Sequence, residues 1–335
     1  MRKMNMERLG LRAIDRGRGR YGKRAAQRTL MENQRHARRF SLACLMTLCL
    51  CLPAQADVYI DRTPPEDWAQ RPLLRIIAID ANRNDAILLN CQGETMLVDS
   101  ADGCSLAAIC AAADAQQVTS FKYLFSTHSD TDHIWGFPGL IHEEGYAFGE
   151  FLSPNPEYYK DKERNHERVT YALCKLEIPY RQLEDGELLT LGDASLRVMR
   201  CMEKLGANAR SAALYISYGE SRALLTADAE SVAMRYYADQ YGADGQLRAD
   251  IMKAPHHGIN ALPTEFAEAV SPELIFVTNL ERNVPRYRGR VRQALPEARL
   301  MFCGEGSVVM ETDGENWYVW QLPSNQLLTA EDLVR

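Results

Sequence analysis

The chain has 335 residues, of which 46% are hydrophobic and 25% charged, and its formal net charge at pH 7 is −6. This composition is typical of a globular protein and excludes a collagen-like, low-complexity or intrinsically disordered chain. A chain of this length can bury most of the surface that its unfolded form exposes, in one large domain or two medium ones.

The N-terminal segment has the order of charged and apolar residues that is typical of a signal peptide. Residues 1–39 contain 13 Lys and Arg against three acidic residues, and an uncharged apolar run of 13 residues follows at 40–52. This run is too short to cross a bilayer as a helix, and Ala54 and Ala56 form a small-x-small cleavage pattern. We therefore predict that residues 1–56 are a signal peptide and that the protein is exported, periplasmic or secreted. An uncleaved membrane anchor and a translation start at Met31 are the alternatives.

Removal of this leader would make the protein strongly acidic. The chain after residue 56 has a net charge near −16, because the basic residues are concentrated in the leader. Proteins gain affinity for nucleic acids when a basic surface releases the counterions of the phosphates. Tight binding of nucleic acid is therefore disfavoured, although a locally basic face would permit it. No stable partner is evident from the sequence.

Hydrophobic periodicity and turn residues divide the rest of the chain into elements. Residues 57–72, rich in Pro and charge, are predicted to be a linker before a folded domain at 73–322 and a C-terminal tail at 323–335. Short apolar runs predict strands at 74–79, 86–89 and 96–98, followed by a helix at 106–113 and a buried strand at 123–126. Residues 142–180 are polar and aromatic without a strand pattern, which predicts an inserted helical lid.

The second half of the domain repeats this order of strands followed by helices. Strands are predicted at 188–191, 196–199, 213–218, 222–226, 251–253, 274–278, 300–302, 307–311 and 317–321. Helices are predicted at 231–241, 264–270 and 289–295. Two meanders, each followed by helices, predict an α+β fold in which two β-sheets pack face to face with helices outside.

Four potential metal ligands lie within six residues after the predicted strand at 123–126. The sequence there is Thr127-His128-Ser129-Asp130-Thr131-Asp132-His133. A single His or Asp in a loop is more often a solvated residue or a turn former. Four such groups at one strand end would repel and desolvate one another unless a cation compensated them. The cluster therefore predicts a metal site.

Two further strand ends carry groups of the same kind. The apolar strand at 222–226 is followed by Asp228, whose carboxylate can bridge two metal ions, and the strand at 251–253 is followed by His256 and His257. Gly258 permits a tight turn after the two histidines. For adjacent histidines we expect one ligand and one neighbour that orients it or contacts the substrate. Because successive side chains of a strand point to opposite sides, we predict His256 as the ligand and His257 at the rim of the cleft.

In this ordered set of motifs the chain resembles the metallo-β-lactamase superfamily, and within it the ComEC-like (competence protein) subgroup. The resemblance spans about residues 73–322 and includes Asp85-Ala86, Leu97-Val98-Asp99 and the three strand ends. It implies an αββα sandwich of two mixed β-sheets with the metal site at one edge between the sheets. It departs from the subgroup at Asn82-Arg83-Asn84, in place of a Gly-Gln-Gly turn, and at Ala227, in place of Gly.

The resemblance also implies roles for the candidate ligands. Two divalent metal ions are expected, with zinc first and manganese as the alternative. His128 and Asp130 would serve the first ion, Asp132, His133 and the paired-histidine motif the second, and Asp228 would bridge them. Asp99 would support the loop. Many members of the superfamily contribute one more His, and here the residues around 208–211 stand in the corresponding region, which leaves the first site short of protein ligands.

These features predict a metal-dependent hydrolase in which a metal-activated water attacks the substrate. Asp132 and Asp228 are the candidates to hold or relay the proton of the water, and His257 to assist the leaving group. Because the superfamily fold does not fix the substrate, a lactam or thioester hydrolase is one alternative, and a degenerate metal-binding or interaction module without turnover is another. The ComEC-like resemblance favours a phosphodiesterase that acts on a small-molecule or cell-envelope phosphodiester.

Overall fold

The computed structural model describes residues 55–154, 163–202 and 206–334. Almost all of the predicted signal peptide, residues 1–54, lies outside the described residues. In the ranges that are described, no helix is both long enough and apolar enough to cross a membrane. Residues 53–335 form a single unit with its own core.

Two β-sheets form the centre of this unit, as the sequence predicts. In spatial order the first sheet contains β1 (Asp57–Ile60), β16 (Asn316–Gln321), β15 (Val308–Thr312), β2 (Leu74–Ala78), β3 (Ile87–Cys91), β4 (Glu94–Val98), β5 (Ser120–Phe125), β6 (Ala147–Ser153) and β7 (Tyr180–Gln182). The second contains β14 (Arg299–Phe302), β13 (Leu274–Val277), β12 (Ile251–Lys253), β11 (Ser221–Leu225), β10 (Ala213–Tyr218), β9 (Ala194–Met199) and β8 (Leu188–Leu191). Both sheets are mixed, because β4 to β7 and β11 to β14 run parallel while the pairs between β2 and β4 and between β8 and β11 are antiparallel.

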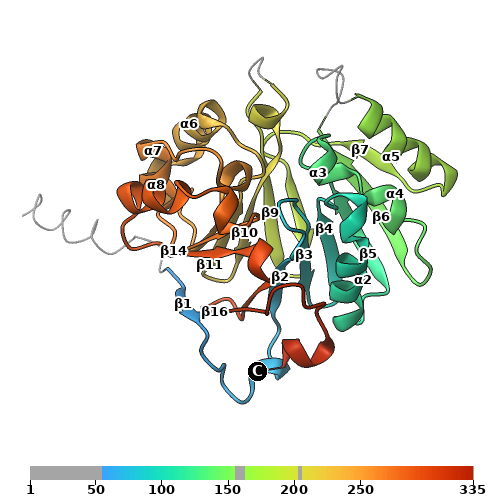
Figure 1. The fold of residues 1–335 in the computed structure, drawn as a ribbon, viewed down its shortest axis with the longest axis horizontal. Helices are drawn as coiled ribbons and strands as arrows, with labels where there is room; N and C mark the ends of the chain where they lie inside the picture. The colour runs from blue at the N-terminus through green and yellow to red at the C-terminus, as the bar shows by residue number, and fades with distance from the viewer. Residues whose placement is uncertain (1–54, 155–162, 203–205, 335) are drawn as a thin grey trace, which may run out of the picture. The chain divides into compact units, whose positions relative to one another are not determined.

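Helices cover the outer face of each sheet (Figure 1). The first sheet carries α2 (Leu106–Ala115), α3 (Thr131–Ile134), α4 (Phe137–Leu140) and α5 (Glu163–Lys175), and the second carries α6 (Ser231–Tyr241), α7 (Thr264–Val270) and α8 (Tyr287–Ala294). The alternation of each strand sends one set of apolar side chains into a core between the sheets, such as Leu89 and Leu214, and the other set toward the helices. The predicted αββα architecture is therefore confirmed.

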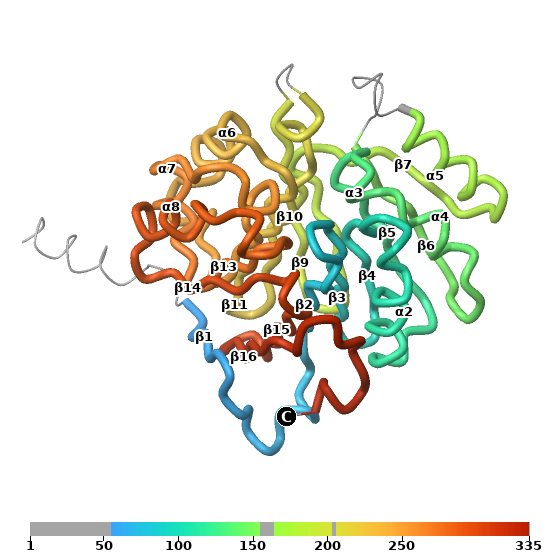
Figure 2. The backbone as a smooth tube through the Cα atoms, viewed as in Figure 1, coloured from blue at the N-terminus to red at the C-terminus, as the bar shows by residue number. Residues whose placement is uncertain are grey.

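Three segments differ from the prediction. The segment predicted to be a linker forms β1, which pairs with β16, and a 3-10 helix, η1 (Trp68–Gln70), whose Trp68 is buried and donates a hydrogen bond to Glu311. The predicted tail contains η9 (Ala330–Leu333), whose Asp332 carbonyl accepts a hydrogen bond from Trp320. These two terminal segments line one cavity, and Figure 2 shows them side by side. Pro and charged residues did not prevent order because each segment has a partner far away in the sequence.

The predicted helical lid is the third difference. Only α5 is helical in the part of this region that the structure describes, and β6 and β7 extend the first sheet instead. β6 pairs in parallel with β5 along most of its length and buries Phe151 and Leu152. Its first half, Ala147 to Glu150, alternates between exposed and half-buried residues, so its sequence is too polar to predict a strand.

Candidate metal centre

Loops that follow three strands bring the predicted ligands together. The loop after β5 carries His128 and leads into α3 with His133, the loop after β11 carries Asp228, and β12 leads into the 3-10 helix η6 (Pro255–Gly258) with the paired histidines. β5 belongs to one sheet and β11 and β12 to the other. The site therefore lies where the ends of strands from both sheets meet, and neither sheet could form it alone.

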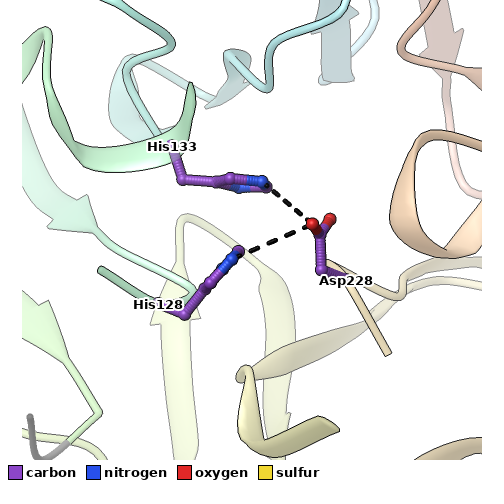
Figure 3. Close-up of side chains that lie close together, drawn as sticks. All are labelled: His128, His133 and Asp228. Carbon is purple, nitrogen blue, oxygen red and sulfur yellow. Dashed lines mark ion pairs between the residues drawn. The ribbon is translucent and has the colours of Figure 1, made fainter. Parts of the chain in front are cut away.

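Asp228 is the common neighbour of the imidazoles. Its Oδ2 lies 3.3 Å from His133 Nε2, 3.5 Å from His257 Nε2, 3.6 Å from His256 Nε2 and 3.8 Å from His128 Nε2. Figure 3 shows the rings of His128, in the loop after β5, and His133, on α3, pointing toward this carboxylate. The sequence predicted a central position for Asp228, and the structure adds that four imidazoles face one of its oxygens.

The two remaining predicted ligands lie at the edge of this cluster. Asp130 precedes α3, and its Oδ2 is 3.8 Å from His128 Nε2. Asp132 in the first turn of α3 places Oδ2 3.5 Å from His257 Nε2, and its side chain is 39% exposed. All six predicted metal ligands and the three predicted catalytic residues thus lie around one centre, with Asp132 nearest to solvent.

The paired histidines depart from the geometry on which their roles were predicted. His256 and His257 both have left-handed backbone conformations, with φ of 48° and 51°, so the alternation of an extended strand does not apply to them. Both rings turn toward Asp228, but the His257 side chain is only 4% exposed and that of His256 is 23% exposed. The structure therefore places His257 inside the cluster and His256 at the rim, the reverse of the predicted positions.

Two groups to which the sequence pattern gave no role in the site complete the buried layer. Lys253 Nζ lies 2.8 Å from Asp85 Oδ2 and donates a hydrogen bond of 2.9 Å to the carbonyl oxygen of Ala227. Asp85 Oδ1 lies in turn 3.2 Å from His257 Nδ1. A lysine inside the otherwise apolar strand Ile251-Met252-Lys253 was the available signal, because a buried lysine needs a carboxylate partner.

Asp99 has the supporting position that the resemblance implies. Its Oδ2 lies 2.6 Å from His133 Nδ1, and its two oxygens accept hydrogen bonds from the backbone N and the hydroxyl of Thr127. A carboxylate on Nδ1 fixes the ring so that Nε2 faces Asp228. His257 is oriented in the same way, because Asp85 and the Thr278 carbonyl oxygen, at 3.2 Å, both face its Nδ1.

Burial and the carboxylates shift the pKa values of these groups in opposite directions. Burial lowers the pKa of His128 to about 4, which keeps its ring neutral. Burial also disfavours charge on His133 and His257, but nearby carboxylates, Asp228 foremost, raise the pKa of both well above the usual value. Burial opposes the charge of Asp132, yet a hydrogen bond from His257 and the charges of both rings lower its pKa to about 2. Without a metal ion, protonated imidazoles compensate the buried carboxylates.

The residues present fit a pair of divalent cations. His128 Nε2 and Asp228 Oδ1 are buried and have no hydrogen-bond partner, so each is a ligand atom that a cation would satisfy. One group of atoms that could hold an ion is His128, His133 and Asp228, and a second is Asp132, His133 and His257. Imidazole and carboxylate ligands together suit zinc and, with more oxygen, manganese. His256 is not part of either group.

Comparison with known proteins decides the family. The sequence model of the metallo-β-lactamase superfamily matches residues 80–277 of this chain, which is more than half of its length. The chain belongs to this superfamily. The match spans the segment that carries every proposed ligand of the candidate centre, from His128 to His257. No curated protein shows significant similarity to the chain.

Several solved structures are similar to the chain at low sequence identity. The metallo-β-lactamase fold protein YhfI from Bacillus subtilis is 13% identical, with a TM-score of 0.49 over 72% of this chain and 100% of its own. The metallo hydrolase Igni18 from Ignicoccus hospitalis is 14% identical, with a TM-score of 0.44 over 71% and 98% of the two chains. A diphosphatase of the PhnP family is 13% identical, with a TM-score of 0.43 over 71% and 98%.

Proposed function

We propose that this protein is an exported metal-dependent phosphodiesterase of the ComEC-like subgroup. The observation that carries the hydrolase is Asp228, whose Oδ2 lies within 3.8 Å of three buried imidazoles from both sheets and whose Oδ1 has no hydrogen-bond partner. Superfamily membership supports a metal-dependent hydrolase. The leader at residues 1–56 supports export, and the motif order supports the subgroup.

The charges of the centre favour two divalent ions. Five carboxylates surround it, from Asp85, Asp99, Asp130, Asp132 and Asp228. Lys253 supplies one buried positive charge, which leaves four negative charges. If the imidazoles are neutral, two divalent cations would balance these four charges. His128, Asp130 and Asp228 would hold one ion and Asp132, His133 and His257 the other, with Asp228 between them. We propose zinc first and manganese as the alternative.

The two partly exposed side chains of the centre, Asp132 and His256, are assigned the proton transfers. Bound cations would polarise the substrate and lower the pKa of the attacking water. Asp132 is half-exposed and its Oδ2 lies 3.5 Å from His257 Nε2, so its carboxylate would accept a hydrogen bond from the attacking water or relay its proton. His256 lies at the rim, where its side chain is 23% exposed beside Asn208 and Asn260 and its ring can reach a leaving group. We therefore assign leaving-group protonation to His256 and a ligand role to His257.

The substrate class rests on the subgroup and on charge. The ComEC-like motif order favours phosphodiesters over lactams and thioesters. A chain whose net charge is near −16 after cleavage would repel long polyanions, so a small or envelope phosphodiester fits better than nucleic acid. A lactam or thioester hydrolase and a metal-binding module without turnover are the competing functions.

The decisive experiment measures hydrolysis of three reporters by one preparation of the full chain. The protein is stripped of metal with a chelator, reloaded with Zn²⁺ or Mn²⁺, and incubated with bis-p-nitrophenyl phosphate, a chromogenic lactam or a thioester. We expect metal-dependent cleavage of the phosphodiester alone. Cleavage of the lactam or thioester instead would establish the first alternative, and bound metal without turnover of any reporter would establish the second.

A matched pair of variants ties the activity to the centre. Asp228→Asn removes the charge of the proposed bridging carboxylate after β11. Asp250→Asn makes the same change at a buried carboxylate just before β12, where Asp250 accepts hydrogen bonds from Arg222 N and Trp317 Nε1. We expect loss of phosphodiesterase activity in the first variant only. Equal activity in both would contradict the proposed site.

A further inference from the structure

A cavity of about 280 Å³ lies at the end of the second sheet that is remote from the metal centre. Arg222, near the start of β11, and Asp250, just before β12, line it, whereas the metal ligands follow the ends of the same two strands. Gln55, Arg197 and Arg248 also line this cavity. We call it the arginine cavity. It shares no residue with the metal centre.

Among the described residues, none of the three guanidinium groups of the arginine cavity forms an ion pair, although the charge of Arg222 opposes the rise in the pKa of the neighbouring Asp250. Arg222 Nη1 donates to the carbonyl oxygens of Gly219 and Ser221, and the Arg197 guanidinium lies 5.9 Å from the centre of the Tyr215 ring. Within the described part of the chain no carboxylate lies within 4.0 Å of Arg197, Arg222 or Arg248. Arginines gathered in one cavity without acidic partners offer donors that an anion would satisfy.

The acidic residues of the cavity do not fill that need. Asp250 is buried, uses Oδ2 to accept from the Arg222 backbone N and from Trp317, and has a pKa that burial raises to about 6. Glu220 and Asp244 are exposed. Among the described residues, these carboxylates therefore form no ion pair with the half-buried arginines of the cavity.

The side-chain amide of Gln55 is hydrogen-bonded to Arg248 in the arginine cavity. Its Oε1 accepts hydrogen bonds from Arg248 Nε at 2.9 Å and Nη2 at 2.5 Å, which is how a guanidinium binds a carboxylate oxygen. Its Nε2 is buried and has no hydrogen-bond partner. An amide is thus only half suited to this position, because its oxygen is paired with Arg248 while its buried NH₂ group finds no acceptor. An oxyanion would present acceptors on both sides.

We propose that the arginine cavity is a second ligand site, which binds a small oxyanion through Arg248 with Arg197 and Arg222. The side-chain amide of Gln55 occupies the position of that anion in the uncut chain. Cleavage after Ala56, which the sequence predicts, would remove Gln55 and open the site. Carboxylate and phosphoryl groups share the required chemistry, and the experiment distinguishes them.

The test uses the metal-free full chain, so that anions do not bind at the metal centre. Gln55→Glu places a carboxylate where the amide stands, and we expect a higher Tm than that of the wild type. Gln55→Ala vacates the position, and calorimetric titration should show one site for inorganic phosphate or for succinate, with at least about tenfold higher affinity than in the wild type. The probe that binds more tightly identifies the group.

Two arginine variants locate the anion. Arg248→Gln in the Gln55→Ala background should weaken anion binding at least about tenfold. Arg299→Gln is the matched control. Arg299 donates a hydrogen bond of 2.7 Å to the Val58 carbonyl oxygen in β1, but it does not line the cavity. A Gln55→Glu variant no more stable than the wild type would overturn the proposal. So would Gln55→Ala binding neither probe, or binding one with an affinity that Arg248→Gln leaves unchanged.

Discussion

Lys253 Nζ lies 2.8 Å from Asp85 Oδ2, and the two side chains are 1% and 2% exposed. Neither residue is among the proposed metal ligands, yet Asp85 also faces His257 Nδ1 and Lys253 Nζ lies 3.8 Å from Asp228 Oδ1. The pair therefore forms the floor of the metal centre. Burial opposes the charge of Lys253, but Asp85 and Asp228 raise its pKa above the usual value, so it stays charged.

Lys253→Met is expected to destabilise the metal-free protein by about 3–5 kcal/mol, because it leaves a buried carboxylate without its counter-charge. Urea unfolding measures the change.

Asp85→Asn is expected to lower the affinity for metal about 10- to 100-fold, since an amide orients His257 without stabilising it as a ligand.

Glu311→Gln is the control for both variants. Glu311 is buried, pairs with Arg75 at 2.5 Å and accepts from Trp68, all remote from the metal centre. We expect this variant to lose stability and to keep its affinity for metal. If Asp85→Asn binds metal as tightly as Glu311→Gln does, Asp85 has no positioning role.

Asp228→Asn is expected to lower metal content by about one ion per chain and turnover by more than about a hundredfold, because a neutral amide cannot balance two cations. Elemental analysis after dialysis gives the first number and reporter hydrolysis the second. Folding should survive, since removing this charge also relieves repulsion among buried carboxylates. A variant with full metal content and unchanged turnover would show that Asp228 does not bridge.

The paired histidines should separate by phenotype. His257→Ala is expected to lose metal, because its ring is buried between Asp132 and Asp228. His256→Ala should keep most of its metal and lose turnover by about a hundredfold or more, the usual contribution of a general acid. Metal analysis and steady-state kinetics on both variants decide the matter. Metal loss in His256→Ala alone would restore the roles expected from strand alternation.

Binding of metal should become tighter as pH rises. In the metal-free protein the raised pKa values of His133 and His257 keep both rings protonated at neutral pH, whereas a ligand ring must be neutral. Their protonation stabilises the metal-free fold fully below the unfolded pKa of 6.5 and is lost as pH rises through the folded pKa values. The increase in Tm caused by Zn²⁺ should therefore grow between about pH 6 and about pH 9. An increase that is the same across this range would contradict the shifts.

Export predicts a defined N-terminus. Expression of the full gene in its host should yield protein that starts at or near Asp57, since Ala54-Gln55-Ala56 matches a cleavage pattern. N-terminal sequencing of the purified protein identifies its first residue. A soluble protein that starts at Met1 or Met31 would refute both export and the net charge near −16.

The types of ligand and the strands that present them could be predicted from the sequence. Apolar runs bounded by turns defined β8, β10, β12, α6 and α7 at the observed residues, because periodicity reports burial directly. Since a His or Asp directly after such a run is unusual without a cation, the strand ends also indicated the centre around Asp228. The order of the motifs indicated the superfamily.

Long-range contacts decided the rest. The left-handed turn at His256 and His257 is held by hydrogen bonds from His256 N to the Ala227 carbonyl oxygen and from Asn279 Nδ2 to the His257 carbonyl oxygen, so residues far away in the chain choose which ring is buried. β1 and β6 are strands because β16 and β5 offer them open edges, and their own sequences are too polar to show it. Asp85 and Lys253 are 168 positions apart, and only the meeting of the two sheets makes each the counter-charge of the other.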